Sequence, residues 1–174
     1  MGKFILIRHG EPDYSYVDAN NYRGLGHELA KLNVDNESTI IELSKNKELK
    51  DADLIIASPY TRTMQTACIL SRALDLRVIV EEDLIEWKAD INFQYDGYED
   101  IKKAKEEYEK NNGIHNNNDK YNWEEKRSLK QRAENVLLKY NNYNKIIVVA
   151  HGMLIKALTN ITNIDYGNFV ILNK

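Results

Sequence analysis

The sequence predicts a single-domain α/β protein with a mostly parallel central sheet. Two observations carry this prediction. First, short continuous apolar runs, at Phe4–Ile7, Leu54–Ala57 and Lys145–Ala150, are typical of strands buried on both faces. Second, segments with helical spacing separate these runs, as in folds where strands alternate with crossover helices. A chain of 174 residues fits one domain over positions 1–174, and a domain of this size buries roughly 70% of its unfolded surface.

The first predicted strand stops at Arg8-His9-Gly10, where a cation, an imidazole and a flexible glycine follow without a spacer. Ligands of open α/β sheets bind at the carboxyl ends of parallel strands. We therefore expect Arg8 and His9 at a binding edge. The polar, tyrosine-rich segment 12–32 leaves directly from His9, so we interpret it as a surface loop or as a wall of the pocket.

A helix is predicted from about Asn36 to Lys45, and the strand Leu54–Ala57 follows it. Ser58 then fits an N-cap, because a proline at the next position is typical of the start of a helix. This helix is predicted to reach about Leu74. Arg62 lies in its first turn, where backbone amides and the helix dipole favour an anion. We expect Cys68, the single cysteine, to be buried on this helix, and no internal disulfide can form.

A short strand is predicted at Arg77–Val80, followed by an acidic turn that ends at Glu86. Glu86 differs from the other carboxylates of the turn because Leu84, Ile85 and Trp87 surround it. Apolar surroundings raise the pKa of a carboxyl group, which suits a general acid.

The second half of the chain contains a variable insertion around 88–122, with a charged helix near its centre. The asparagine-rich segment 111–122 has no periodicity, so we expect a mobile loop without chemistry. His27 and His115 lie in polar loops and are predicted to be exposed. The further elements expected are helices at 100–108 and 123–140, a helix that starts at Gly152, and a last strand at 169–172.

The strand Lys145–Ala150 ends in His151-Gly152, which repeats the pattern that follows the first strand. A single histidine at a strand end is more often a capped or surface residue than a ligand. Two such strands lying side by side, however, would place His9 and His151 at one edge of the sheet. This repetition favours a functional site.

Composition limits the classes of function. The net charge of −3 argues against a general nucleic-acid binder, because no basic excess is present to meet a phosphate backbone. No stretch approaches the roughly 18 apolar residues that a membrane span needs. The N-terminus also lacks a signal-type apolar segment, so we expect a cytoplasmic protein that binds neither membranes nor nucleic acids.

Four ordered segments of the chain together resemble the signature elements of the histidine phosphatase superfamily, in its phosphoglycerate-mutase-like branch. The resemblance implies a three-layer α/β/α fold, with His9 as the nucleophile and Glu86 as the proton donor. It also implies that the substrate is bound by Arg8, Ser15, Arg62, His151 and Gly152, with no metal and no cofactor. The segments are Arg8–Glu11, Ser58–Arg62, Leu84–Trp87 and Ala150–Gly152.

Departures from the mutase pattern favour hydrolysis of a small phosphorylated metabolite over phosphoryl transfer. Tyr14-Ser15 stands where mutases carry a Trp-Asn pair, and no double arginine occurs between 100 and 132. The tail after Asn168 is short, and an open pocket admits water. Mutase-type transfer stays the alternative.

Two other classes of function are weighed as well. A non-catalytic module that binds phosphorylated ligands would be expected to lose the nucleophile or the acid, and neither is missing. A metal site formed by His9, His151 and Glu86 is disfavoured, because Arg8 and Arg62 would repel a dication. The sequence leaves open whether the chain forms a homodimer.

Overall fold

The computed structural model describes residues 2–173 and contains a five-stranded sheet in the order β5-β4-β6-β1-β7. Four strands are parallel, and β7 pairs antiparallel with β1 at one edge. The predicted class, α/β with a mostly parallel sheet, is confirmed. The strands are β1 (Lys3–Arg8), β4 (Leu54–Ala57), β5 (Val78–Val80), β6 (Lys145–Ala150) and β7 (Phe169–Asn173).

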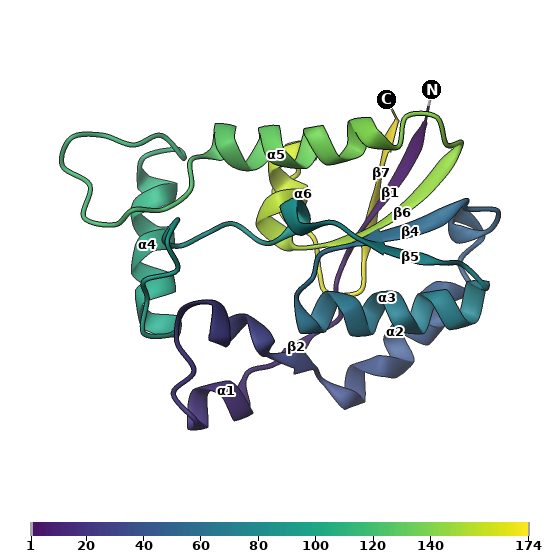
Figure 1. Ribbon diagram of the computed structural model, residues 1–174, viewed down its shortest axis with the longest axis horizontal. Coiled ribbons are helices and arrows are strands. Elements are labelled where there is room, and N and C mark those ends of the chain that lie inside the picture. The colour runs from purple at the N-terminus through teal and green to yellow at the C-terminus, as the bar shows by residue number, and fades with distance from the viewer. Residues whose placement is uncertain (1, 174) are drawn as a thin grey trace.

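Helices cover both faces of this sheet, which gives the three layers (Figure 1). The helices α2 (Glu37–Ser44) and α3 (Thr61–Leu74) lie on one face, and α5 (Lys126–Lys139) and α6 (Gly152–Thr159) lie on the other. The helices α1 (Ser15–Ala19) and α4 (Tyr98–Lys110) lie beyond one end of the sheet. Shorter elements are the strands β2 (Pro12–Asp13) and β3 (Lys31–Leu32) and the 3-10 helices η1 (Gly24–Leu29), η2 (Val34–Asn36), η3 (Lys47–Leu49) and η4 (Glu82–Leu84).

The side chains of β1 alternate between two apolar clusters. Ile5 and Ile7 pack in the cluster on the α2 and α3 side, while Phe4 and Leu6 pack in the cluster on the α5 and α6 side. All four are fully buried. Complete burial of such a side chain stabilises the fold by roughly 1.5–3 kcal/mol. Burial on both faces is the reason that the strand has a continuous apolar run instead of an alternating pattern.

The register of β1 and β6 brings the two His-Gly sequences together. Arg8 is opposite Ala150 in this parallel pair, so His9 and His151 leave the sheet at neighbouring positions. The backbone amide of His9 also donates to the carbonyl oxygen of Ala150, at 3.0 Å. A shift of one residue would send the side chains to opposite faces, so this register positions the site.

Two segments differ from the sequence prediction. Residues 12–32, expected to be a loop, contain β2, α1, η1 and β3. Gly24 has φ +51°, and a Cβ added there would lie 2.2 Å from the carbonyl oxygen of Phe93, so this close approach requires glycine.

The helix predicted from 123 begins at Lys126 instead, because the backbone of residues 122–124 forms hydrogen bonds with another stretch of chain. The amide of Ile91 donates to Asn122 and the amide of Glu124 donates to Lys88, both at 2.9 Å.

The segment 111–122 is irregular, as predicted, but it is tied to the domain. The ring of His115 stacks on buried Trp123 with 3.7 Å between centroids, and its nitrogens contact Asp119 Oδ2 and the carbonyl oxygen of Trp123. The expectation that His115 is exposed is therefore wrong, because its side chain is half-buried, and its absence from the chemistry stays a prediction. Cys68 is exposed, not buried, because Ala67 and Leu70 occupy the buried face of α3.

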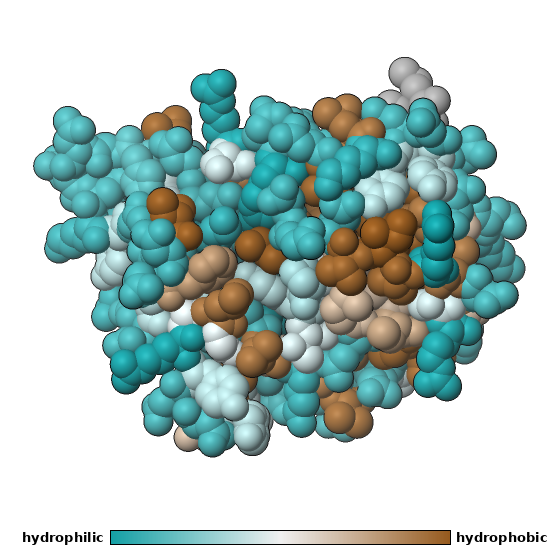
Figure 2. Space-filling model, viewed as in Figure 1, coloured by the Kyte–Doolittle hydropathy of each residue, from teal (hydrophilic) through white to brown (hydrophobic). Residues whose placement is uncertain are grey.

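Polar residues predominate on the face of the molecule shown in Figure 2, and an apolar patch lies over the open edge of the sheet near β5. In that strand, Val78 and Ile79 are partly buried and Val80 is exposed. Within residues 2–173, no helix combines the length and the apolar character that crossing a membrane requires.

Candidate active site

His9 directly follows β1 and is held in one tautomer. Its Nδ1 lies 2.6 Å from the carbonyl oxygen of Gly10, which can only accept a hydrogen bond, so Nδ1 carries the proton. The lone pair is then on Nε2. The Nε of Arg62 donates to this Nε2 at 3.2 Å. The geometry therefore presents Nε2, the potential nucleophile, to the side where Arg62 lies.

The environment of His9 keeps its ring neutral. Burial lowers the pKa of His9 well below its usual value, and the Arg62 and Arg8 guanidinium groups lower it further. The hydrogen bond to Gly10 acts in the opposite direction but does not prevail. A neutral imidazole with a free lone pair is the form that can attack phosphorus.

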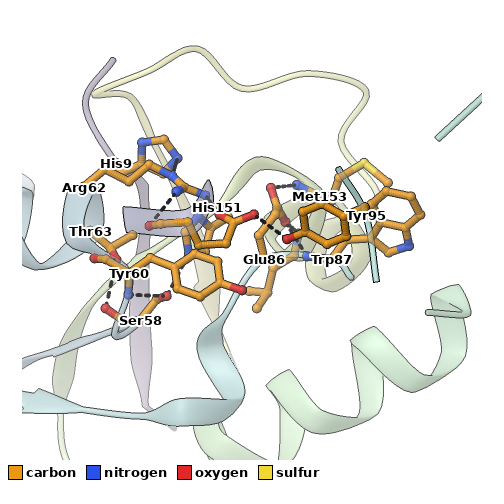
Figure 3. A network of polar contacts seen from close by, with 12 residues as sticks. His9, Ser58, Tyr60, Arg62, Thr63, Glu86, Trp87, Tyr95, His151 and Met153 are labelled. Carbon is orange, nitrogen blue, oxygen red and sulfur yellow. Dashed lines mark hydrogen bonds and ion pairs between the residues drawn. The ribbon is translucent and has the colours of Figure 1, made fainter. Parts of the chain in front are cut away.

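Arg62 lies in the first turn of α3, as predicted, and is buried. Figure 3 shows its side chain beside that of His9. Its guanidinium carbon also lies 5.1 Å from the ring centroid of Tyr60. A planar guanidinium with donors on two edges is suited to a phosphoryl group.

Arg8 reaches the same region from the end of β1. Its Nη1 donates to the carbonyl oxygen of Ile164 at 2.7 Å, and its guanidinium carbon lies 3.7 Å over the Tyr166 ring. Among the described residues, its buried Nε has no hydrogen-bond partner. Tyr166 in turn lies against His9, with 5.5 Å between centroids. Arg8 therefore keeps one donor unused beside the candidate nucleophile.

His151 lies against His9, with 5.1 Å between ring centroids, and is completely buried. Its Nε2 lies 2.7 Å from Ser58 Oγ, and its Nδ1 is unpaired within residues 2–173. The prediction that Ser58 is an N-cap is wrong: α3 begins at Thr61, and the Ser58 hydroxyl orients His151 instead. The structure thus brings the two imidazoles together, although His151 does not form part of the pocket wall.

Glu86 occupies the other end of the network in Figure 3. Its carboxylate accepts from the amides of Trp87, Met153 and Leu154, at 2.9, 3.2 and 3.2 Å; the last two belong to the first turn of α6. Burial raises the pKa of Glu86, and this effect exceeds the opposing effects of those amides and of Arg62. The sequence-based expectation of a raised pKa agrees with this direction.

Arg132 of α5 holds the backbone that carries Glu86. Its Nη2 donates to the carbonyl oxygen of Glu86 at 3.0 Å, and its Nη1 donates to those of Asp83 and Ile85. The guanidinium also forms a doubly hydrogen-bonded pair with the buried carboxylate of Glu124, at 2.8 Å on each arm. Three carbonyl groups and one carboxylate therefore converge on a single side chain.

We predict that Arg132→Leu lowers the free energy of unfolding by about 3–5 kcal/mol, because it leaves the Glu124 carboxylate buried without its partner. Urea unfolding of the wild type and the variant measures this difference. The double variant Arg132→Leu/Glu124→Leu removes both charges and should recover part of the loss. A loss below about 1 kcal/mol for the single variant would contradict this account.

A cavity of about 320 Å³ connects these groups. Of the predicted substrate-binding residues, Arg8, Arg62 and Gly152 line it, together with the predicted nucleophile His9 and proton donor Glu86, while His151 does not. Ser15 does not line it: Ser15 is exposed and its hydroxyl donates to Asp13, while the neighbouring Tyr14 forms part of the wall. Aromatic side chains and two lysines from α1, α4, α6 and the loops supply the rest of the wall, among them Tyr14, Trp87, Tyr95, Tyr98, Lys105, Lys156 and Tyr166.

His27 and Glu28 are among the polar residues of this cavity that the sequence did not predict. His27 was expected to be exposed, but it is buried, stacked on Tyr14 with 4.8 Å between centroids, and its Nε2 lies 3.3 Å from Asp18 Oδ1. Glu28 lies in the same 3-10 helix and pairs with Arg62. Neither residue stands next to a strand end or in an apolar run, so periodicity gave no signal for them.

Within residues 2–173, no group of three or more histidine, cysteine or carboxylate side chains is arranged to hold a metal ion. His9, His151 and Glu86, the trio considered above as a metal site, do not form such a group. Their surroundings contain the guanidinium groups of Arg8 and Arg62 instead.

Comparison with known families assigns the chain. The model of the histidine phosphatase superfamily (branch 1) matches residues 4–171, which is nearly the whole sequence. The chain therefore belongs to the histidine phosphatase superfamily, branch 1. A search of curated proteins gives no match to this sequence.

Solved structures confirm the fold. A mycobacterial glucosyl-3-phosphoglycerate phosphatase superposes with a TM-score of 0.75 at 17% identity, covering 99% of this chain and 90% of that one. The α-ribazole phosphatase of Shigella flexneri gives a TM-score of 0.68 at 20% identity, covering 98% and 90%. YhfR of Bacillus stearothermophilus gives 0.73 at 16%, covering 99% and 91%. At these identities the similarity establishes the phosphoglycerate-mutase-like fold alone.

Proposed function

We propose that this protein is a phosphomonoesterase that hydrolyses a small phosphorylated metabolite through a phosphohistidine at His9, without a metal or a cofactor. One observation carries the proposal: a buried, neutral His9 presents Nε2 beside the Arg62 guanidinium, in a cavity that also contains Glu86. A cavity of about 320 Å³ is at the lower end of the range for small-molecule sites, which suits a metabolite.

In the first step, Nε2 of His9 attacks phosphorus and the bond between phosphorus and the leaving oxygen breaks. The charge on the transferring group is spread over its equatorial oxygens, so catalysis rests on positioning and electrostatics. Arg62 and Arg8 supply cationic donors for these oxygens. The ring of His151, whose Nδ1 is unpaired within residues 2–173, lies 5.1 Å from the ring of His9 between centroids. Glu86, whose raised pKa favours the protonated form, gives its proton to the leaving alcohol.

In the second step, water attacks the phosphohistidine and the nitrogen–phosphorus bond breaks. The Glu86 carboxylate, now ionised, takes a proton from the attacking water and returns to its starting state. Inorganic phosphate leaves, and His9 is again neutral. Atoms and protons therefore balance over the cycle with the side chains of this chain alone.

Hydrolysis is favoured over mutase-type transfer by the sequence of the insertion, which lacks a double arginine for a substrate carboxylate. Two of the structures that share the fold are named as phosphatases, which supports the same choice. A mutase must also exclude water while its intermediate reorients. The same cavity would serve both reactions, so the choice rests on these arguments.

The test is hydrolysis of p-nitrophenyl phosphate by the purified protein in the presence of excess EDTA. We expect release of p-nitrophenol that chelation does not reduce. Activity that disappears with EDTA and returns with a divalent cation would contradict a metal-independent mechanism. No hydrolysis of this substrate or of a panel of metabolite monoesters would favour the binding module instead.

A further inference from the structure

The carboxylate of Glu28 occupies the second edge of the Arg62 guanidinium. Its Oε2 accepts from Arg62 Nη2 at 2.7 Å, and Arg62 Nη1 also donates to the backbone carbonyl of Glu28 at 3.4 Å. Its Oε1 accepts from the hydroxyl of Tyr95 at 3.2 Å. The two charged side chains are 3% and 13% exposed, so this ion pair is largely shielded from water.

The backbone that leads to Glu28 is fixed by packed neighbours. Gly24, four residues earlier, packs closely against the carbonyl oxygen of Phe93, and the amide of Gly24 donates to the carbonyl oxygen of Tyr95 at 2.9 Å. His27 next to it is buried against Tyr14. Packed neighbours therefore fix the position of the carboxylate, and its contact with Arg62 is not that of a mobile surface side chain.

This arrangement divides the donors of Arg62. Its Nε edge contacts the nucleophile His9, while its Nη2 edge is taken by a carboxylate that also lines the cavity. A phosphoryl group on His9 would meet the same guanidinium. Glu28 must then share Arg62 with a dianion of like charge, and like charges in a shielded site repel strongly.

We propose that Glu28 is a positioning residue that sets how tightly the site holds phosphate: it orients Arg62 toward His9 and competes with the phosphoryl oxygens for that guanidinium, so that the inorganic phosphate product leaves. This inference rests on the proposed function, because it takes phosphate to be the product. The ligand with which Glu28 competes for Arg62 is inorganic phosphate or a phosphomonoester.

The variant Glu28→Gln separates the two parts of this role. The glutamine oxygen can still accept from Arg62, and the glutamine NH2 can donate to the Tyr95 hydroxyl, so the guanidinium keeps its orientation, but the negative charge is gone. Arg62 also keeps its contacts with His9 and Tyr60. At a separation of about 4 Å, a unit charge contributes about 1 kcal/mol in bulk water and more when shielded, which corresponds to at least about fivefold in affinity.

The experiment is isothermal titration calorimetry of inorganic phosphate into the wild type and into Glu28→Gln at one pH and ionic strength. We expect the Kd for phosphate to fall by at least about fivefold in the variant. The matched control is Glu42→Gln on α2, which removes the same charge from an exposed side chain and should leave the Kd within about twofold. An unchanged or weaker affinity of Glu28→Gln would overturn the proposal.

Turnover of p-nitrophenyl phosphate gives a second readout. In Glu28→Gln, both KM and the inhibition constant of phosphate should fall. A general loss of structure would not lower both constants. Glu28→Asn is also neutral and keeps an amide oxygen that can accept from Arg62, so it carries the same expectation for phosphate and decides the question if the glutamine variant does not fold. A wild type that binds phosphate without turnover would contradict the proposed function while leaving the binding comparison intact.

Discussion

Replacement of His9 by alanine should abolish turnover, with a loss on the order of 10⁵-fold or more, the scale expected when a covalent nucleophile is removed. The reason is that no other described side chain presents a neutral imidazole nitrogen to the cavity beside Arg62. His151 is buried behind His9 and bonds to Ser58, so it cannot take over the attack without rearrangement. The remaining groups would still bind phosphate.

The measurement combines steady-state turnover with trapping of the intermediate. Rapid quenching of the wild type during turnover of a ³²P-labelled monoester should yield acid-labile label on a peptide that contains His9, and none in His9→Ala. His115→Ala serves as the control, because His115 lies outside the cavity and should keep both turnover and label. Label on any other residue would reassign the nucleophile.

The second large effect is expected for Glu86→Gln, which should lower turnover of an alkyl phosphate by roughly 10²–10⁴-fold, the usual contribution of a general acid. The loss should be much smaller with p-nitrophenyl phosphate, whose leaving group needs no proton. Glutamine retains one acceptor oxygen, which can still accept from the amides of Trp87 and Leu154, so the loop should keep its place.

The pH dependence follows from the same residue. Because burial raises the pKa of Glu86, its protonated form persists to higher pH than in an exposed glutamate. The wild-type kcat for an alkyl phosphate should decline as the pH rises through that raised pKa, and this decline should be absent in Glu86→Gln. Glu82→Gln, at an exposed carboxylate of η4, should behave as the wild type. If Glu86→Gln lost equal turnover on the alkyl phosphate and on p-nitrophenyl phosphate, Glu86 would be excluded as the acid.

The parts of the site that the sequence predicts are those attached to regular elements. His9 and His151 end apolar strands, and Arg62 lies in the first turn of a helix; periodicity locates each of them. Parallel strands end at one edge, so their proximity follows from the fold class. Glu86 could be singled out because its neighbours are apolar.

The remaining parts depend on contacts between distant segments. Glu28 becomes part of the site only because η1 docks against the stretch that carries Tyr95, 67 residues further on. Tyr14 and Ser15 are adjacent, and which of them faces the cavity is decided by how α1 packs, so the choice of Ser15 failed. His27 is buried by stacking on Tyr14, and His115 is half-buried by stacking on Trp123; local composition does not predict either contact.

The order of strands also has a consequence for biosynthesis. β1 emerges first from the ribosome, yet its only neighbours in the sheet are β6 and β7, whose residues begin at 145 and 169. The apolar residues 4–7 of this strand must therefore wait for most of the polypeptide to be translated before they find a partner, and unpaired strands of this kind are prone to aggregate. Nascent chains that stop before residue 145 should thus need chaperone protection and remain inactive.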